Sequence, residues 1–325
     1  MKHMNAQIVD EIVKQMPGKR RPVVYLMKAL SLGKESAYRR IKDQIPFTFE
    51  EVAIIARDLD LSIDQILGQK VNNNISFYAD LNVEQDPMDI YANMLTKDIA
   101  FMEKLITSSD LKITAIINRI PLRYFPFKAL FKFEYCHYLY SIGHIPLMMR
   151  FSDIAVPHQI SSLHEKCTYY FRGLQNITCV LDSMVYSKLI REIQYYHRMG
   201  FITEEDLHSL QSELFEILEM YESMLRKGKS SSGTNYTFYY SHLTLDSSSI
   251  FIEYNSSLSL QFWIYPESPV IINNNSMISD VQRRWIDSKI RNSMLITKTN
   301  DTQQIEMLRD VYKQISDLAK PMNTI

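Results

Sequence analysis

The spacing of apolar residues in the first seventy positions is the feature that most constrains the fold of this chain. Apolar side chains recur there at intervals of three and four residues, which is the period of amphipathic helices. The runs are short because turn signals interrupt them, at Pro17-Gly18 and again at Ser31-Leu32-Gly33. The pattern predicts five short helices, at about 5–16, 22–30, 34–42, 48–59 and 62–68.

The ends of these predicted helices carry signals of their own. Two capping boxes and a closing glycine are present: Thr48 with Glu51, Ser62 with Gln65, and Gly68. The second and third helices are joined by a turn of three residues. This arrangement is typical of a helix-turn-helix domain, which we predict for residues 1–70.

A resemblance to a known family rests on residues 26–68, whose sequence is LMKALSLGKESAYRRIKDQIPFTFEEVAIIARDLDLSIDQILG. This stretch resembles the Cro and CI repressor-like (XRE-type) helix-turn-helix regulators, in particular a bacterial branch with a large C-terminal domain of unknown role. The most specific parts are SAYRRI at 36–41 and PFTFEE at 46–51. The resemblance implies that residues 34–42 form the recognition helix.

The chain departs from the family pattern at two places. Met27 or Lys28 stands where a small residue is usual in the second helix. The glycine that is usual in the turn falls on Ser31 or Gly33, and the sequence leaves both registers open. A non-glycine residue in the left-handed conformation at that point would cost about 1 kcal/mol relative to glycine.

Charge is distributed unevenly along the predicted domain, although the whole chain has a net charge of −1. Residues 14–42 hold nine bases against the single acid Glu35, whereas residues 43–64 hold six acids against Arg57. A compact domain built from both stretches would have one basic side, which suits a polyanion such as DNA. The alternative is an ordinary solvated surface with helix charges.

The predicted recognition helix would present its first turn and its outer face to base edges in the major groove. We expect four residues to read bases: Lys34, Glu35, Ser36 and Arg39. We expect five to contact phosphates: Lys19, Arg20, Arg21, Arg40 and Lys42. An alternative is that Glu35, Arg39 and Asp43 form a surface ion-pair ladder. Tyr38 is expected in the core of the domain.

The rest of the chain is predicted to hold a linker, residues 71–87, and an α+β domain, residues 88–325. Helices are expected at about 88–107, 126–142, 158–198 with an interruption near Gly173, 203–226, 279–291 and at the C-terminal end. Strands are expected at about 111–117, 236–243, 250–254, 258–264 and 294–297. Period-two alternation in this part predicts an antiparallel sheet covered by helices.

Two helices of the second domain have further signals. The helix at 203–226 has coiled-coil spacing at Leu207, Leu210, Leu214, Ile217, Tyr221 and Met224. These residues would either form a dimer seam or pack the helix onto its own domain, and a homodimer is expected because it would span two half-sites. The final helix is expected to be capped by Asp301 and Gln304.

Composition excludes several classes of protein. Hydrophobic residues make up 46% and charged residues 22% of the chain, which is typical of folded globular proteins. No apolar run approaches about 18 residues, so no membrane span is expected. The three cysteines have no CxxC spacing, which favours a reducing, cytoplasmic location over a disulfide scaffold or a cysteine-rich zinc site.

Motifs for catalysis are absent from the sequence. The histidines are scattered, with neither an HExxH motif nor a pair four residues apart, so no catalytic residue, metal or cofactor is expected. The leading hypothesis is a sequence-specific transcriptional regulator that binds double-stranded DNA, with the second domain providing dimerisation or sensing of a small-molecule or protein effector. The alternatives are an enzyme of unknown class in the second domain, localised by the first, and a protein-interaction scaffold.

Overall fold

The computed structural model describes residues 4–15, 21–59, 86–145, 149–255, 257–265, 268–273 and 276–320. The chain divides into two compact units, Met1–Tyr78 and Ala79–Ile325, which we call the head and the body. The division falls within the predicted linker, of which only Asp86 and Pro87 are described. The predicted capping box at Ser62 and Gln65 also lies outside the described residues.

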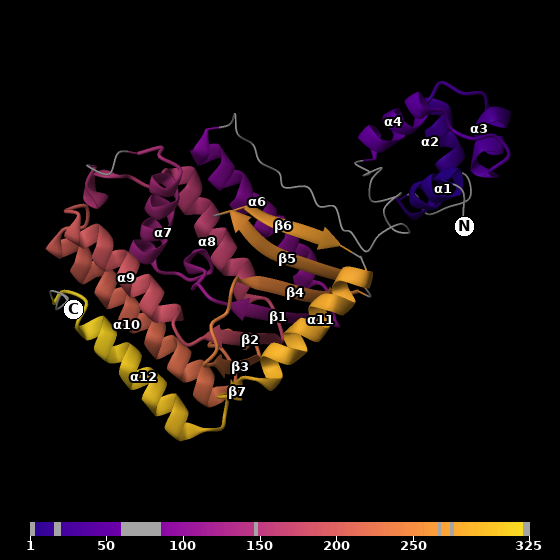
Figure 1. The fold of residues 1–325 in the computed structure, drawn as a ribbon. Helices are drawn as coiled ribbons and strands as arrows, with labels where there is room; N and C mark the ends of the chain where they lie inside the picture. The colour runs from indigo at the N-terminus through magenta and orange to yellow at the C-terminus, as the bar shows by residue number, and fades with distance from the viewer. Residues whose placement is uncertain are drawn as a thin grey trace. The chain divides into compact units, whose positions relative to one another are not determined.

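Four described helices form the head: α1 (Met4–Gln15), α2 (Arg21–Ala29), α3 (Lys34–Ile41) and α4 (Phe49–Asp58) (Figure 1). Their bounds agree closely with four of the five helices that apolar spacing predicts. Their apolar faces meet in one core, whose buried members are Ile8, Ile12, Val23, Leu26, Ala37, Val52 and Ile55. Burial of these faces against one another stabilises helices that are too short to persist alone in water.

The turn between α2 and α3 contains one residue in the left-handed conformation. Ser31 has a φ of 52°, whereas Gly33 has a φ of −66° and a ψ of 152°. The structure therefore assigns the left-handed position to Ser31 and settles the register of the turn. A residue with a Cβ atom costs roughly 1–2 kcal/mol in this conformation, which glycine adopts freely.

The start of α4 has the predicted capping box. The hydroxyl of Thr48 accepts a hydrogen bond from the Glu51 amide at 3.2 Å, and the Glu51 carboxylate accepts one from the Thr48 amide at 2.9 Å. Each side chain thus satisfies a backbone N–H that has no partner within the helix. The capping box confirms where the sequence expected this helix to begin.

The body contains a seven-stranded sheet with the order β6-β5-β4-β1-β2-β3-β7. Its strands are β1 (Lys112–Ile117), β2 (Ile177–Asp182), β3 (Tyr236–Ser241), β4 (Ser249–Tyr254), β5 (Ser257–Tyr265), β6 (Ser268–Asn273) and β7 (Met294–Leu295). The pairs β1–β2 and β2–β3 are parallel, and the other neighbouring pairs are antiparallel. The sheet is therefore mixed, and the prediction of an antiparallel sheet is wrong in its centre.

The parallel centre of the sheet was missed because β2 lies within residues 158–198, which were predicted to be helical. The strand Ile177–Asp182 is a nearly continuous apolar run, and it lies between β1 and β3 with both faces covered. Strands buried on both faces lack the alternation that marks a half-exposed strand. The notion that strands adjacent in the sequence pair in order, an antiparallel meander through β3, β4 and β5, also fails, because β4 pairs with β1 and β5 and not with β3.

Helices cover both faces of the sheet (Figure 1). One face packs on α11 (Ser276–Arg291), through residues such as Ile116, Phe251 and Ile286. The remaining body helices lie on the side of the other face and share one core with it, α12 packing on α9 and α10. They are α6 (Pro87–Ile106), η1 (Leu122–Tyr124), α7 (Lys128–Ser141), η2 (Phe151–Asp153), α8 (His158–Arg172), α9 (Val185–Arg198), α10 (Glu204–Lys227) and α12 (Asp301–Ser316). None of the helices in the described ranges is long and apolar enough to cross a membrane.

A buried ionic contact joins several segments at the carboxyl end of β2. Asp182 is fully buried, and its carboxylate accepts hydrogen bonds from Lys188 Nζ at 2.9 Å, from Met184 N at 2.7 Å and from Leu245 N at 3.1 Å. Lys188 Nζ also donates to the carbonyl of Asn118 at 3.3 Å. Burial acts to raise the pKa of Asp182, but these donors together lower it, so the carboxylate stays charged.

The coiled-coil spacing in α10 belongs to the core of the body. All six seam residues are buried in its main core: Leu207, Leu210, Leu214, Ile217, Tyr221 and Met224. The helix packs on α7, α9, α12 and β3, so this seam is the packing face of an amphipathic helix. The second of the two interpretations is the one that the structure bears out.

The final helix starts differently from the prediction. Asn300, with a φ of 58°, is the N-cap residue of α12, and Asp301 is its first helical residue. The side-chain amide of Gln304 donates to the carbonyls of Ile296 at 2.6 Å and Thr299 at 2.9 Å. The expected cap by Asp301 and Gln304 is therefore wrong, because Gln304 holds the preceding segment.

The strain at Ser31 gives a prediction for the head. Ser31→Gly should stabilise it by about 1 kcal/mol, because glycine relieves the left-handed strain. Gly33→Ala should also be tolerated, with a gain of about 0.4–1 kcal/mol, since a Cβ atom at Gly33 meets nothing within 4 Å. Amide hydrogen exchange of α2 and α3 in the full chain measures both changes. Weaker protection in Gly33→Ala would show that the turn has the other register.

Candidate nucleic-acid interface and a cavity in the body

The outer face of α3 carries the residues that were predicted to read bases. Lys34, Glu35 and Arg39 are exposed, and Ser36 is half-buried. The side chains of these four residues make no hydrogen bond or ion pair within the described part of the chain. Ala37 is fully buried on the opposite face, which directs Arg39 away from the core. The helix thus presents uncommitted polar groups to solvent.

Arg40 is placed differently from its neighbour. Its guanidinium forms a two-point contact with the Glu51 carboxylate, with Nε to Oε2 at 3.0 Å and Nη2 to Oε1 at 2.7 Å. Both side chains are largely buried, with exposed fractions of 13% and 15%. Arg40 therefore links α3 to the first turn of α4, a role that its assignment to phosphate did not anticipate.

The alternative ion-pair ladder on α3 does not form. Glu35 and Arg39 make no contact with each other, and Asp43 accepts a hydrogen bond from the side-chain amide of Asn5 instead. Asn5 Oδ1 in turn accepts from the backbone of Phe47 at 2.9 Å, so Asn5 ties α1 to the segment that follows α3. Neither of these hydrogen bonds involves a side chain on the outer face of α3.

Other predicted residues of the head have mixed outcomes. Lys42 is exposed, and its Nζ lies 4.8 Å from the ring centroid of Tyr38. The expectation that Tyr38 is a core residue is wrong, because 48% of this residue is exposed and Ala37 takes the inward position. Lys19 and Arg20 lie outside the described residues, and α2 begins at Arg21.

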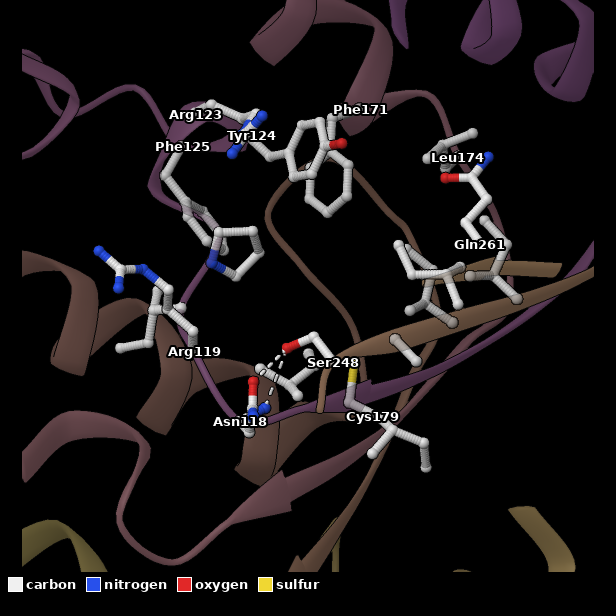
Figure 2. A pocket seen from close by; sticks show the side chains of 18 of the residues that line it. Asn118, Arg119, Arg123, Tyr124, Phe125, Phe171, Leu174, Cys179, Ser248 and Gln261 are labelled. Atoms are coloured by element: carbon white, nitrogen blue, oxygen red, sulfur yellow. Dashed lines mark hydrogen bonds between the residues drawn. The ribbon is translucent and has the colours of Figure 1, made fainter. Parts of the chain in front are cut away.

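The body contains a cavity of about 400 Å³ that the sequence analysis did not predict. Its lining comes from the face of strands β1 to β5 that is turned away from α11, from α6, α7, α8 and α10, from the segment around η1 and from the connection between β3 and β4. Figure 2 shows Tyr124 and Phe171 close together on one side of it, where their rings stack at 4.9 Å. Asn118 and Ser248 lie on another side and share a hydrogen bond of 2.6 Å.

Most charged groups around the cavity have a partner, while Asp246 lies exposed at its mouth. Arg123 Nη2 lies 2.7 Å from Glu134 Oε1, and both residues are buried. Asp98 accepts a hydrogen bond from Tyr124 at 3.0 Å, and burial raises its pKa. At the mouth, Arg119 donates to Glu192 at 2.8 Å. Among the described residues, no group of three His, Cys, Asp or Glu side chains could hold a metal ion.

His137 also lines the cavity. Burial, with a smaller contribution from the positive charge of Arg119, lowers its pKa to about 4. Its Nδ1 lies 3.0 Å from the hydroxyl of Tyr196. The ring is therefore neutral near neutral pH, and it adds no charge to the lining.

The polar face of β5 is a sequence signal that could have pointed to this cavity. Ser259, Gln261 and Trp263 alternate with apolar residues along this strand, which is the pattern of a half-buried strand. In the structure Ser259 and Gln261 are buried, and Gln261 and Trp263 line the cavity. A polar face of a strand can thus face an internal cavity as well as water.

Comparison with known proteins adds no further constraint. No protein-family model matches the chain, and no curated protein or solved structure is significantly similar to it. The resemblance of residues 26–68 to XRE-type regulators accordingly stays a prediction from the sequence.

The lowered pKa of His137 predicts how the stability of the body depends on pH. The unfolded chain binds a proton at a pKa near 6.5, whereas the folded chain does so only near 4. Above pH 6.5 His137 is neutral in both states and does not change the free energy of unfolding with pH. As the pH falls from 6.5 toward 4, protonation of the unfolded chain lowers the free energy of unfolding by at most about 3 kcal/mol. Urea unfolding followed by tryptophan fluorescence measures this loss.

The matched variants are His137→Gln and, as a control, His242→Gln at an exposed position. The first should weaken the dependence of the unfolding free energy on pH between 6.5 and 4, since it removes a group that takes up a proton on unfolding. The second should leave the dependence close to that of the wild type. Identical pH profiles for wild type and His137→Gln would contradict the assignment.

Proposed function

We propose that this chain is a sequence-specific transcription regulator that binds double-stranded DNA with α3 in the major groove. The observation that carries the proposal is the outer face of α3, where Lys34, Glu35 and Arg39 are exposed and have no partner within the described residues. These groups can bond base edges without first breaking a contact inside the protein. An arginine in such a position can make two hydrogen bonds to guanine.

The way in which α3 is held supports the same proposal. The short turn after α2 sets one end of the helix, and the buried contact between Arg40 and Glu51 attaches the other end to α4. A recognition helix must be held rigidly, because its bonds to bases depend on position. We therefore assign Arg40 to positioning of the helix, and keep Lys19, Arg20, Arg21 and Lys42 as the proposed phosphate contacts.

We further propose that the chain acts in the cytoplasm as a homodimer, with the body providing dimerisation or sensing. The buried cysteines Cys136, Cys167 and Cys179 are free, which suits a reducing compartment. A dimer would let two heads occupy neighbouring half-sites and so gain affinity. Since the seam of α10 is buried within the body, the dimer contact would involve another surface.

Two neighbouring arginines give a direct test. Arg39→Ala should reduce discrimination between selected and scrambled DNA by about 1–3 kcal/mol and leave the thermal stability of the head nearly unchanged. Arg40→Ala should instead destabilise the head, because it leaves the largely buried Glu51 carboxylate without its partner. Fluorescence anisotropy with both DNAs and thermal melting separate the two effects.

Arg57→Ala is the control for this pair, since it removes an exposed positive charge from the last turn of α4. It should keep the discrimination of the wild type. If Arg39→Ala binds both DNAs as the wild type does, α3 is not the helix that reads bases. The proposal would then be wrong at its central point.

Salt dependence tests the proposed phosphate contacts. If about four phosphates are neutralised per head, the logarithm of the DNA association constant should fall against the logarithm of salt concentration with a slope of about −4. Lys42→Ala should reduce the magnitude of this slope by about one and weaken binding equally on all sequences. Titrations at several salt concentrations measure the slope. A response that is flat with salt would favour a protein partner for the head.

A further inference from the structure

The cavity in the body is larger than the voids that close packing leaves. Protein interiors hold few empty spaces bigger than a water molecule, whereas this one has a volume of about 400 Å³. That volume lies within the range of pockets that bind small organic molecules, roughly 300–1,000 Å³.

Most of the lining is apolar, which limits the kind of molecule that fits. The sheet contributes Ile113, Ala115, Ile250 and Ile252, and the helices contribute side chains such as Met102. Aromatic rings form a second part of the wall: Phe101, Tyr124, Phe125, Phe171, Tyr236 and Phe238. The burial of apolar ligand surface against such walls would supply most of the binding free energy.

One buried polar side chain in this apolar wall has no partner. Gln261 is 7% exposed and lines the cavity, yet its side-chain amide makes no hydrogen bond within the described residues. Figure 2 shows it beside Leu174, on the side away from Asn118 and Ser248. A ligand with a complementary donor and acceptor would complete the hydrogen bonds of this amide.

The charged groups inside the cavity are engaged with protein partners, which favours an uncharged ligand. Arg123 is paired with Glu134, and Arg119 is paired with Glu192. Asp98 already accepts a hydrogen bond from Tyr124. No positive group in the described lining is left to neutralise a ligand carboxylate, which would therefore lose its hydration without compensation.

The cavity has a route to solvent. Arg119, Asp246 and Ser247 line it and are exposed, so they mark its mouth. Next to them, Ser248 is bonded to Asn118, which joins the end of β1 to the start of β4. The entrance thus lies where several strand ends meet, which is a common location for ligand sites in sheets with parallel strands.

We propose that this cavity binds an uncharged, mainly apolar small molecule that carries an amide-like donor and acceptor pair for Gln261. The apolar part of the molecule packs against the sheet and the aromatic wall, and its polar group completes the hydrogen bonds of the Gln261 amide. The site goes beyond the proposed DNA binding and does not depend on it.

Three probes of similar shape test the proposal on the full chain: 4-tert-butylbenzamide, 4-tert-butylacetophenone and 4-tert-butylbenzoate. The chain has two tryptophans. Trp263 lines the cavity, and Trp285 packs on the other side of the sheet. The indole N–H signal of Trp263 in NMR spectra should therefore move on addition of the benzamide, and that of Trp285 should not. Trp285→Phe assigns the two signals.

We expect the benzamide to bind at least about tenfold more tightly than the ketone, which lacks a donor, and the charged benzoate to bind most weakly. In Gln261→Leu the preference for the benzamide over the ketone should fall to about onefold, with binding of the ketone retained. Gln159→Leu, at an exposed position on α8, is the matched control and should keep the preference.

Several results would overturn the proposal. The first is that none of the three probes, at up to about 1 mM, shifts the Trp263 signal. The second is that the benzoate binds as tightly as the benzamide. The third is that Gln261→Leu still prefers the benzamide over the ketone. If Gln261→Leu does not fold, the ranking of the three probes on the wild-type chain decides. None of these measurements involves DNA, so a failure here is distinct from a failure of the proposed function.

Discussion

A single buried carboxylate organises the edge of the sheet at which the cavity opens. A charge that is buried without partners would cost several kcal/mol, so Asp182 must be supplied with donors. They come from Lys188 on α9, from Met184 in the turn before it, and from Leu245 in the connection between β3 and β4. Because Lys188 also binds the carbonyl of Asn118, the same contact positions the mouth of the cavity.

The fold of the head and most elements of the body could be predicted because their signals are local, whereas the strand order of the body could not. Helix starts such as Thr48 with Glu51 are patterns of neighbouring residues, and the structure confirms that one. The pairing of β1 with β2 places Ile113 beside Ile177, and no residue pattern in either segment identifies the strand with which it pairs. The strand order and the parallel centre of the sheet therefore had to come from the structure.

The candidate sites show the same limit at the level of single residues. The outward position of Arg39 follows from the helical period once Ala37 is placed inside, so it could be predicted. The partner of Arg40 could not, since Glu51 lies on another helix and meets it only in the folded head. For Gln261, alternation predicted a polar face of β5 and left open whether that face meets water or a cavity.

The topology of the sheet also has a consequence for synthesis. β1 pairs with β2 and β4, and both follow it in the chain. A ribosome makes Lys112–Ile117 first, so this apolar strand has no neighbour until residues as far as Asp182 have emerged. Its second neighbour is complete only when Tyr254 has emerged. The head core, by contrast, uses residues no later than Leu59, so all its described members are available before the first strand of the body is made.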